Sequence, residues 1–272
     1  MTTTTPLLPQ YEEPPVNEVV FSLLFKPIEN LQTPHIGLLW SRYQPEYPYC
    51  DEFAPLLPAI EFFENKSVTT HIELTDVPPL PRSWFISSSE NGVIQIQRDR
   101  FILNWRKVQP EDEYPRYSNI IKLFRPHLSK FEYFLKDLEL GIIEPLQYEI
   151  TYVNHIPKGK GWTMLSDLGK IFPDFAWRIN ENRFLPNCSS LNWRTTFDLP
   201  NQVGRLHVVI RSALREDNHP IVSFELTVRG IEDSGSLEAM WNWFDTAHEW
   251  IVLGFADLTS EEVQKNIWKR RS

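Results

Sequence analysis

The chain has 272 residues, 42% of them hydrophobic and 13% aromatic, so it carries enough apolar side chains to build a large packed core. Its formal net charge of −9 at pH 7 disfavours nonspecific attraction to nucleic acid. No run approaches the roughly 18 apolar residues of a membrane helix, and the N-terminus lacks the basic and apolar regions of a secretion signal. We therefore expect a globular cytoplasmic protein that binds neither nucleic acid nor a membrane.

The few motifs that suggest a metal or cofactor are incomplete. Cys50 and Cys188 lie far apart and form no CxxC pair, which fits a reducing compartment and argues against a zinc site built from cysteines. The sequence HEWIV begins at His248 like a metalloprotease helix, but the position of the required second histidine is Val252. The sequence therefore predicts no metal and no cofactor, and its motifs identify no catalytic residue.

The first 16 residues are expected to form a loose N-terminal arm, because they combine a threonine run with several prolines and show no apolar period. A strand over 17–28 and a helix over 35–44 should follow. After a proline-rich connection, the alternation of apolar and polar residues predicts four strands, over 68–76, 83–88, 92–97 and 100–108.

The segment 94–107 alternates like a strand but has Arg98, Asp99 and Arg100 in its middle. In one continuous strand the apolar residues before the charges and those after them would lie on opposite sides, so the buried face would switch midway. A hairpin that turns at the three charges lets each arm choose its own inward face. We favour the hairpin and keep a single strand with a β-bulge as the alternative.

The longest predicted helix covers 114–140. Its apolar side chains recur at alternating steps of four and three residues, which makes one stripe that must pack against something apolar. Pro126 predicts a kink or break near Phe124, and Gly141 is a suitable stop. The stripe consists of Tyr117, Ile121, Phe124, Leu128, Phe131, Leu135 and Leu138.

The second half repeats the pattern of the first, with predicted elements over 145–157 (strand), 163–175 (helix), 190–198, 205–214 and 220–229 (strands), and 236–256 and 260–270 (helices). We interpret 17–141 and 142–272 as two approximate β-α-β(3–4)-α repeats, offset by about 130 residues and packed as one unit. The expected fold class is α+β, with an antiparallel sheet and helices packed on one face.

Several segments carry a resemblance: EVVFSLLFKPIE, IQIQRDRFILNWRK, YPRYSNI, YEITYVNHI and the C-terminal FDTAHEWIVLGFADLTSEEVQKNIWKR. Together they resemble a sporadically distributed prokaryotic family of uncharacterised proteins of about this length. The resemblance spans nearly the whole chain after the arm, and it implies no activity and no catalytic residues. The order of elements is also similar to the duplicated saddle of TATA-box-binding-like folds. The negative charge and the absence of a basic stripe argue against DNA binding.

A sheet with helices on one face leaves the other face free to meet solvent or a partner. Mixed polar residues rich in arginine are typical of a recognition surface, so our leading hypothesis is a non-enzymatic interaction module: an adaptor, inhibitor or regulator. Arg106, Arg194 and Arg211 are its proposed contacts with a protein partner. The alternatives are a small-ligand-binding protein with a cavity between sheet and long helix, and an enzyme of unrecognised type. The polar face is expected to carry Gln95, Gln97, Asn104, Arg106, Arg194, His207, Arg211, Glu225, Thr227 and Arg229.

Overall fold

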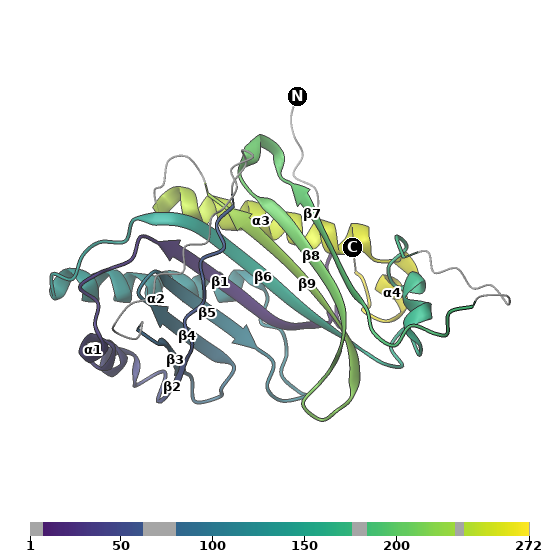
Figure 1. Cartoon of the computed structure of the whole chain (residues 1–272), viewed down its shortest axis with the longest axis horizontal. Coiled ribbons are helices and arrows are strands. Elements are labelled where there is room, and N and C mark those ends of the chain that lie inside the picture. Colours follow the sequence, from purple (N-terminus) through teal and green to yellow (C-terminus); the bar gives the residue numbers. More distant parts are fainter. Residues whose placement is uncertain (1–7, 62–79, 176–183, 232–236, 272) are drawn as a thin grey trace.

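The computed structural model describes residues 8–61, 80–175, 184–231 and 237–271 (Figure 1). These residues form one nine-stranded sheet in the order β2-β3-β4-β5-β1-β6-β9-β8-β7, and every neighbouring pair in it is antiparallel. Figure 1 shows the helices α2 and α3 behind the sheet. The α+β class and the antiparallel sheet are thus confirmed. None of the described helices is long and apolar enough to cross a bilayer.

The first half of the chain supplies one side of the sheet and two helices: β1 (Val16–Phe25), α1 (Thr33–Tyr43), β2 (Tyr49–Phe53), β3 (Arg82–Ile86), β4 (Gly92–Gln97), β5 (Arg100–Arg106) and α2 (Tyr117–Asp137). The second half supplies the other side: β6 (Pro145–Pro157), the 3-10 helices η1 (Leu165–Lys170) and η2 (Pro200–Gln202), β7 (Asn192–Asp198), β8 (Arg205–Leu214), β9 (Pro220–Gly230), α3 (Leu237–Leu258) and α4 (Glu261–Asn266).

The strands β1 and β6 pair with each other near the middle of the sheet and join its two sides. The consecutive strands β3, β4 and β5 continue the sheet beyond β1, and β7, β8 and β9 continue it beyond β6. A register shift between Val16 and Glu18 marks a bulge at the start of β1. This bulge lies next to the pocket described below.

The charged segment at 98–100 does turn the chain, as the hairpin model predicts. β4 and β5 are joined through Arg98 and Asp99, and Ile94 pairs with Leu103 while Ile96 pairs with Phe101. Residues opposite each other in an antiparallel pair share a face. The two arms therefore do not choose separate faces, because all four apolar side chains point to the same side, toward the helices.

The apolar stripe of α2 is buried over its central turns, where Phe124, Leu128, Phe131 and Leu135 are at most 1% exposed. The helix begins and ends about three residues inside the predicted range, so Leu138 lies beyond its last turn and is 37% exposed. The expected break at Pro126 does not occur, since α2 continues through this residue.

Other differences concern short elements. The segment 163–175 forms only the 3-10 helix η1, and 260–270 contains the six-residue α4. The sequence analysis missed β2, whose five residues are all exposed at the edge of the sheet and show no apolar alternation. The predicted strand over 68–76 lies outside the described residues.

The N-terminal arm is packed from Leu8 onward, which corrects the expected loose arm for residues 8–15. The backbone amides of Glu12 and Glu13 donate to the carbonyls of Lys269 and Trp268, at 3.2 and 3.1 Å. Tyr11 is 6% exposed, and its ring packs edge-on against Phe255. Composition missed this docking because a single buried aromatic can hold a proline-rich segment in place.

Candidate functional site

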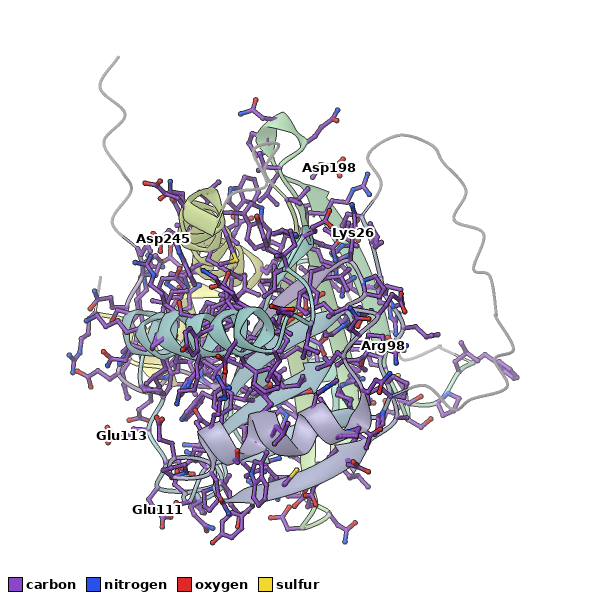
Figure 2. The ribbon with its side chains drawn as sticks, turned by 90° about the vertical axis from the view of Figure 1, so that its left-hand side faces the viewer. Lys26, Arg98, Glu111, Glu113, Asp198 and Asp245 are labelled. Carbon is purple, nitrogen blue, oxygen red and sulfur yellow. The ribbon has the colours of Figure 1, made fainter. Side chains whose placement is uncertain are left out.

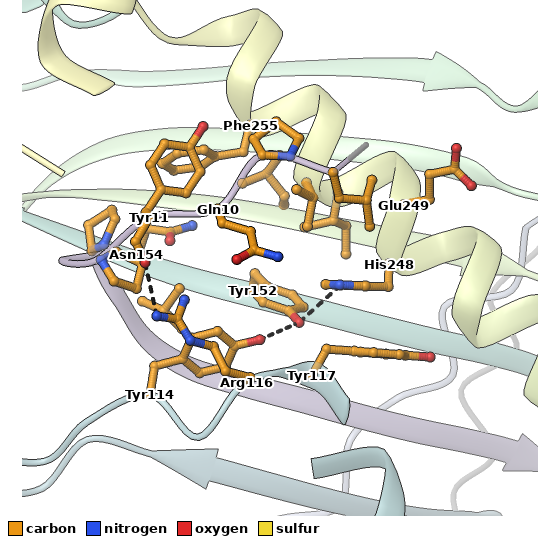
Figure 3. Close-up of a pocket in the computed structure, with 18 of the residues that line it drawn as sticks. Gln10, Tyr11, Tyr114, Arg116, Tyr117, Tyr152, Asn154, His248, Glu249 and Phe255 are labelled. Carbon is orange, nitrogen blue, oxygen red and sulfur yellow. Dashed lines mark hydrogen bonds between the residues drawn. The ribbon is translucent and has the colours of Figure 1, made fainter. Parts of the chain in front are cut away.

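A pocket of about 680 Å³ lies on the helix-covered side of the sheet. Its walls come from six parts of the chain: the arm, the segment leading into α2, the strand β6, the strand β9, the helix α3, and Arg271 near the C-terminus (Figure 3). This volume is within the range of sites that hold small organic molecules. The pocket is therefore the candidate functional site.

The strand and helix periods bring the wall residues together. Tyr152 and Asn154 are two positions apart on β6, so both face the helix side of the sheet. On α3, Asp245, His248 and Val252 follow at steps of three and four, which places them on one face of that helix. Tyr114, just before α2, and Tyr117, the first residue of α2, complete the wall.

A chain of hydrogen bonds crosses the wall (Figure 3). The Tyr114 and Tyr152 hydroxyls lie 2.8 Å apart, and the Tyr152 hydroxyl lies 3.1 Å from Nδ1 of His248. Which atom donates in each bond depends on the tautomer of His248. The three side chains come from a loop, a strand and a helix, so the tertiary fold builds this chain.

An aromatic stack lies beside the hydrogen-bonded chain. The ring of Tyr117 packs on the imidazole of His248 with centroids 4.0 Å apart and planes 2° from parallel. The Tyr117 hydroxyl donates to Oδ1 of Asp245 at 2.7 Å, one turn before His248 on the same helix. The stack and this bond hold the imidazole in one orientation.

Burial keeps His248 and the tyrosines around it uncharged. It lowers the pKa of His248 to about 4 and raises the pKa of Tyr114 to about 12. The pKa of Tyr117 is raised by burial and by the Asp245 carboxylate, and that of Tyr152 by burial and by the neighbouring Tyr114. At neutral pH the wall therefore presents hydroxyl groups and a neutral imidazole.

Arg116 connects the arm to this wall. Its Nη2 donates to the Tyr11 carbonyl at 2.9 Å, and its guanidinium lies 5.7 Å from the centre of the Tyr114 ring. Its φ of 71° is in the left-handed region, which a residue with a Cβ adopts only at a cost of about 1–3 kcal/mol. Such strain is concentrated at functional sites, and here it directs the chain from the pocket wall into α2.

Burial moves the pKa values of the wall away from the range of a general acid or base. A general acid or base works best when its pKa is near the operating pH, and the pKa values of His248 and the three tyrosines lie far to either side of neutrality. Among the residues that the structure describes, no three His, Cys, Asp or Glu side chains are grouped so as to hold a metal ion. Hydrogen bonding and aromatic packing are the interactions that the described wall offers.

The opposite, polar face of the sheet carries the residues singled out from the sequence. The strand registers place all ten of them on the face opposite the one that packs against the helices: Gln95, Gln97, Asn104, Arg106, Arg194, His207, Arg211, Glu225, Thr227 and Arg229. Two of them, Gln95 and Asn104, belong to a ladder of hydrogen bonds across the strands. Nη1 of Arg82 donates to Gln95, Gln95 donates to Asn104, and Asn104 donates to Glu18, at 3.0, 2.7 and 2.5 Å.

The three proposed partner contacts share this polar face but not one location. Arg194 and Arg211 lie on the neighbouring strands β7 and β8, and both are exposed. Arg106 is on β5, four strands from β8, which corresponds to roughly 19 Å at the usual strand spacing. Its Nε donates to the Glu90 carbonyl at 3.0 Å, whereas Arg211 lies 3.7 Å from the Glu225 carboxylate. Only Arg194 and Arg211 can act as a pair.

A segment that we call the strap, residues 54–61, crosses one end of the polar face (Figure 1). Gln97 and Gln147 each exchange two hydrogen bonds with its backbone. At the end of the strap, the Glu61 carboxylate meets Nε2 of His207 at 2.5 Å and Nη1 of Arg205 at 3.1 Å. The polar face is thus partly covered, although the pattern of the sequence predicts an open face.

The sequence gives little indication of the pocket residues. Tyr114, Tyr152 and His248 are far apart in the chain, and the HEWIV pattern at His248 is incomplete. All three lie in segments that carry the family resemblance, but that resemblance implies no site residues. Strand parity places Tyr152 and Asn154 on the apolar face, where a polar asparagine stands out. That mismatch is the signal that marks the site.

Comparison with known proteins gives no further guide to this site. No model of a protein family matches the chain, and a search of curated proteins finds no significant relative.

Proposed function

We propose that the protein binds a small organic ligand in the tyrosine-lined pocket and is not an enzyme. The observation that carries this proposal is the hydrogen-bonded chain Tyr114–Tyr152–His248 in the wall of a pocket of about 680 Å³. Polar groups buried at a cavity and kept neutral are suited to fixing the orientation of a ligand. This function corresponds to the second hypothesis from the sequence, with the cavity placed at the start of α2 and against α3.

Native mass spectrometry tests this proposal directly. Val252 lines the pocket, so Val252→Trp should fill it, while Val108→Trp adds the same side chain at a position that is 36% exposed. Protein purified from cells should carry an additional small mass in the wild type and in Val108→Trp, and this mass should be missing in Val252→Trp. A bound mass that persists in Val252→Trp, or a wild type that never carries one, would contradict the proposal.

We propose as a second function that the polar face contacts a protein partner. The favouring observation is the pair Arg194 and Arg211, exposed on adjacent strands, since arginine contributes strongly to many interfaces. The triple variant Arg106→Ala, Arg194→Ala, Arg211→Ala should stay folded and recover less of a partner in affinity purification from the native host. The matched control changes Lys122 and Lys136, which are exposed on α2. Equal recovery by both variants would exclude this face.

The repeat and the cellular setting are also proposals. The arrangement of β3–β5 beyond β1 and of β7–β9 beyond β6 supports two related halves, each a strand, a helical segment, a meander of four (β2–β5) or three (β7–β9) strands and a helix. The same arrangement supports the likeness to a duplicated saddle. A prokaryotic cytoplasm remains our predicted location, and it follows from the resemblance of the sequence and its cysteine usage.

A further inference from the structure

We infer that the pocket selects an uncharged, flat aromatic molecule that carries a hydrogen-bonding group, such as an amide or a ring nitrogen. This inference rests on the proposed ligand-binding function and specifies its ligand class. Three properties of the wall lead to it: the contacts that its charged side chains make within the protein, the donor and acceptor groups at the ends of its hydrogen-bonded chain, and its stacked rings.

The charged side chains of the wall other than Glu249 already have contacts within the protein. Arg116 donates to the Tyr11 carbonyl, Arg271 pairs with Glu12 at 2.8 Å, and Asp245 accepts from Tyr117. A charged ligand would compete with these contacts, and removing its charge from water in a partly buried site costs free energy. The wall is therefore complementary to a neutral molecule.

The remaining charge opposes an anion, and the tyrosine cage does not favour a cation. Glu249 has no hydrogen bond or ion pair within the described part of the chain, and Figure 3 shows its carboxylate turned away from Tyr152. A carboxylate at the rim repels anionic ligands. Aromatic cages do bind cations, but here the Arg116 guanidinium already lies over the Tyr114 ring and would repel a second positive charge.

The hydrogen-bonded chain offers a ligand either a donor or an acceptor. In one arrangement Tyr114 donates to Tyr152, Tyr152 donates to Nδ1 of His248, and Nε2 carries the hydrogen. In the reverse arrangement Nδ1 donates, Nε2 becomes an acceptor, and the Tyr114 hydroxyl is free to donate. Nε2 of His248 has no protein partner among the described residues, and it is not one of the fully buried polar atoms that lack a hydrogen bond. An amide or a heterocyclic nitrogen can pair with either arrangement.

The rings of the wall favour a flat ligand. Tyr117 and His248 are nearly parallel, and the Tyr152 ring lies 5.8 Å from His248 with its plane 27° away. Stacked rings gain about 0.5–1.5 kcal/mol beyond the area they bury, so an additional aromatic ring should bind better than an aliphatic one of equal size.

A panel of four matched probes tests this inference by isothermal titration calorimetry. Indole-3-acetamide is neutral and aromatic, indole-3-acetate adds a negative charge, tryptamine adds a positive charge, and cyclohexylacetamide removes the aromatic ring. The wild type should bind indole-3-acetamide about 10-fold more tightly than each of the others. Tyr152→Phe should weaken this binding about 5- to 10-fold, because the chain loses its central hydroxyl. The control Tyr133→Phe, at a residue that is 64% exposed, should leave it unchanged.

The possible failures are distinguishable. Equal or tighter binding of the acetate, the amine or the cyclohexyl probe overturns the ligand class and leaves the ligand-binding function in place, as does a Tyr152→Phe variant with unchanged affinity. Binding of none of the four probes also overturns the ligand class. If native mass spectrometry of the wild type finds no bound mass either, the proposed function falls with it.

Discussion

The two faces of the sheet use polar side chains in opposite ways. On the polar face, polar residues are frequent and form hydrogen bonds diagonally from strand to strand, as in the ladder from Arg82 to Glu18. On the helix-covered face they are rare, and those of the pocket are enclosed by tyrosines and apolar side chains. The outer surface shows a third pattern, with solvated charges such as Glu111 and Glu113 at the edge of the molecule (Figure 2).

The contrast indicates which polar residues are candidates for function. A ladder residue is explained once its cross-strand partner is known, because the pair satisfies both groups. A polar residue on an apolar face needs another explanation, since its burial is costly. The chain Tyr114–Tyr152–His248 meets that condition, whereas Gln95 and Asn104 do not.

The largest expected effect is in the core of the helix-covered face. Phe131 is fully buried between α2 and the sheet, where it packs against Phe25 and Phe101. Phe131→Ala should lower the free energy of unfolding by about 3–5 kcal/mol in urea titrations. The control Tyr133→Ala, on the exposed side of the same helix, should change it by less than about 0.5 kcal/mol. Equal losses of stability in Phe131→Ala and Tyr133→Ala would show that the wrong face of α2 has been assigned to the core.

Docking of the arm should come next in size. Tyr11→Ala removes a ring that packs on Phe255 and Trp268 and a hydroxyl that donates to Gln264 at 3.0 Å. We expect a loss of about 3 kcal/mol by chemical denaturation. The neighbouring exposed residue provides the control, as Gln10→Ala should have little effect. If Tyr11→Ala were as stable as the wild type, the prediction of a loose arm from composition would be correct after all.

The buried histidines should make stability depend on pH. Burial lowers the pKa of both His127 and His248 to about 4, below the unfolded value of about 6.5, so the unfolded chain binds protons first as the pH falls. Their contribution is fully present above pH 6.5 and is lost toward pH 4, by up to about 3 kcal/mol for each histidine. Urea titrations from pH 7 to 4 should show a shallower decline in His127→Gln and His248→Gln. Parallel curves for variants and wild type would contradict the lowered pKa values.

The smallest of these effects concerns the polar ladder. Asn104→Ala leaves Gln95 and the carboxylate of Glu18 without their partner, and burial already raises the pKa of Glu18. We expect a loss of about 1–3 kcal/mol, measured by urea denaturation. Asn192→Ala, at an exposed position on β7, is the matched control. A neutral Asn104→Ala would mean that the ladder does not stabilise the sheet.

The sequence predicts the long, regular elements well because their side-chain period is itself the signal. The bounds of β6 and β8 agree with the prediction, and parity alone places polar residues such as Asn104 and Arg211 on one face. Short elements are predicted poorly. The strand β2 has five exposed residues with no alternation, so nothing in the sequence marks it, and η1 is much shorter than the helix predicted over 163–175.

The pocket escapes prediction for a different reason. Its chain links a loop, a strand and a helix through residues that are more than 30 positions apart, so no local spacing carries the information. The docking of Tyr11 is equally non-local, because its hydroxyl partner is Gln264. Only the completed sheet, which sets β6 beside β1 and β9, determines which side chains meet.

The pairing of the arm with the residues near 270 has a consequence for biosynthesis. The backbone bonds that fix this wall of the pocket run from Arg271 to the Gln10 carbonyl at 2.7 Å and from Glu12 to Lys269, so they join residues that are synthesised long after one another. The sheet can begin to assemble on the nascent chain, but this wall has to wait until residue 271 has left the exit tunnel. Ligand capture should therefore begin only after the strands of the sheet have been made.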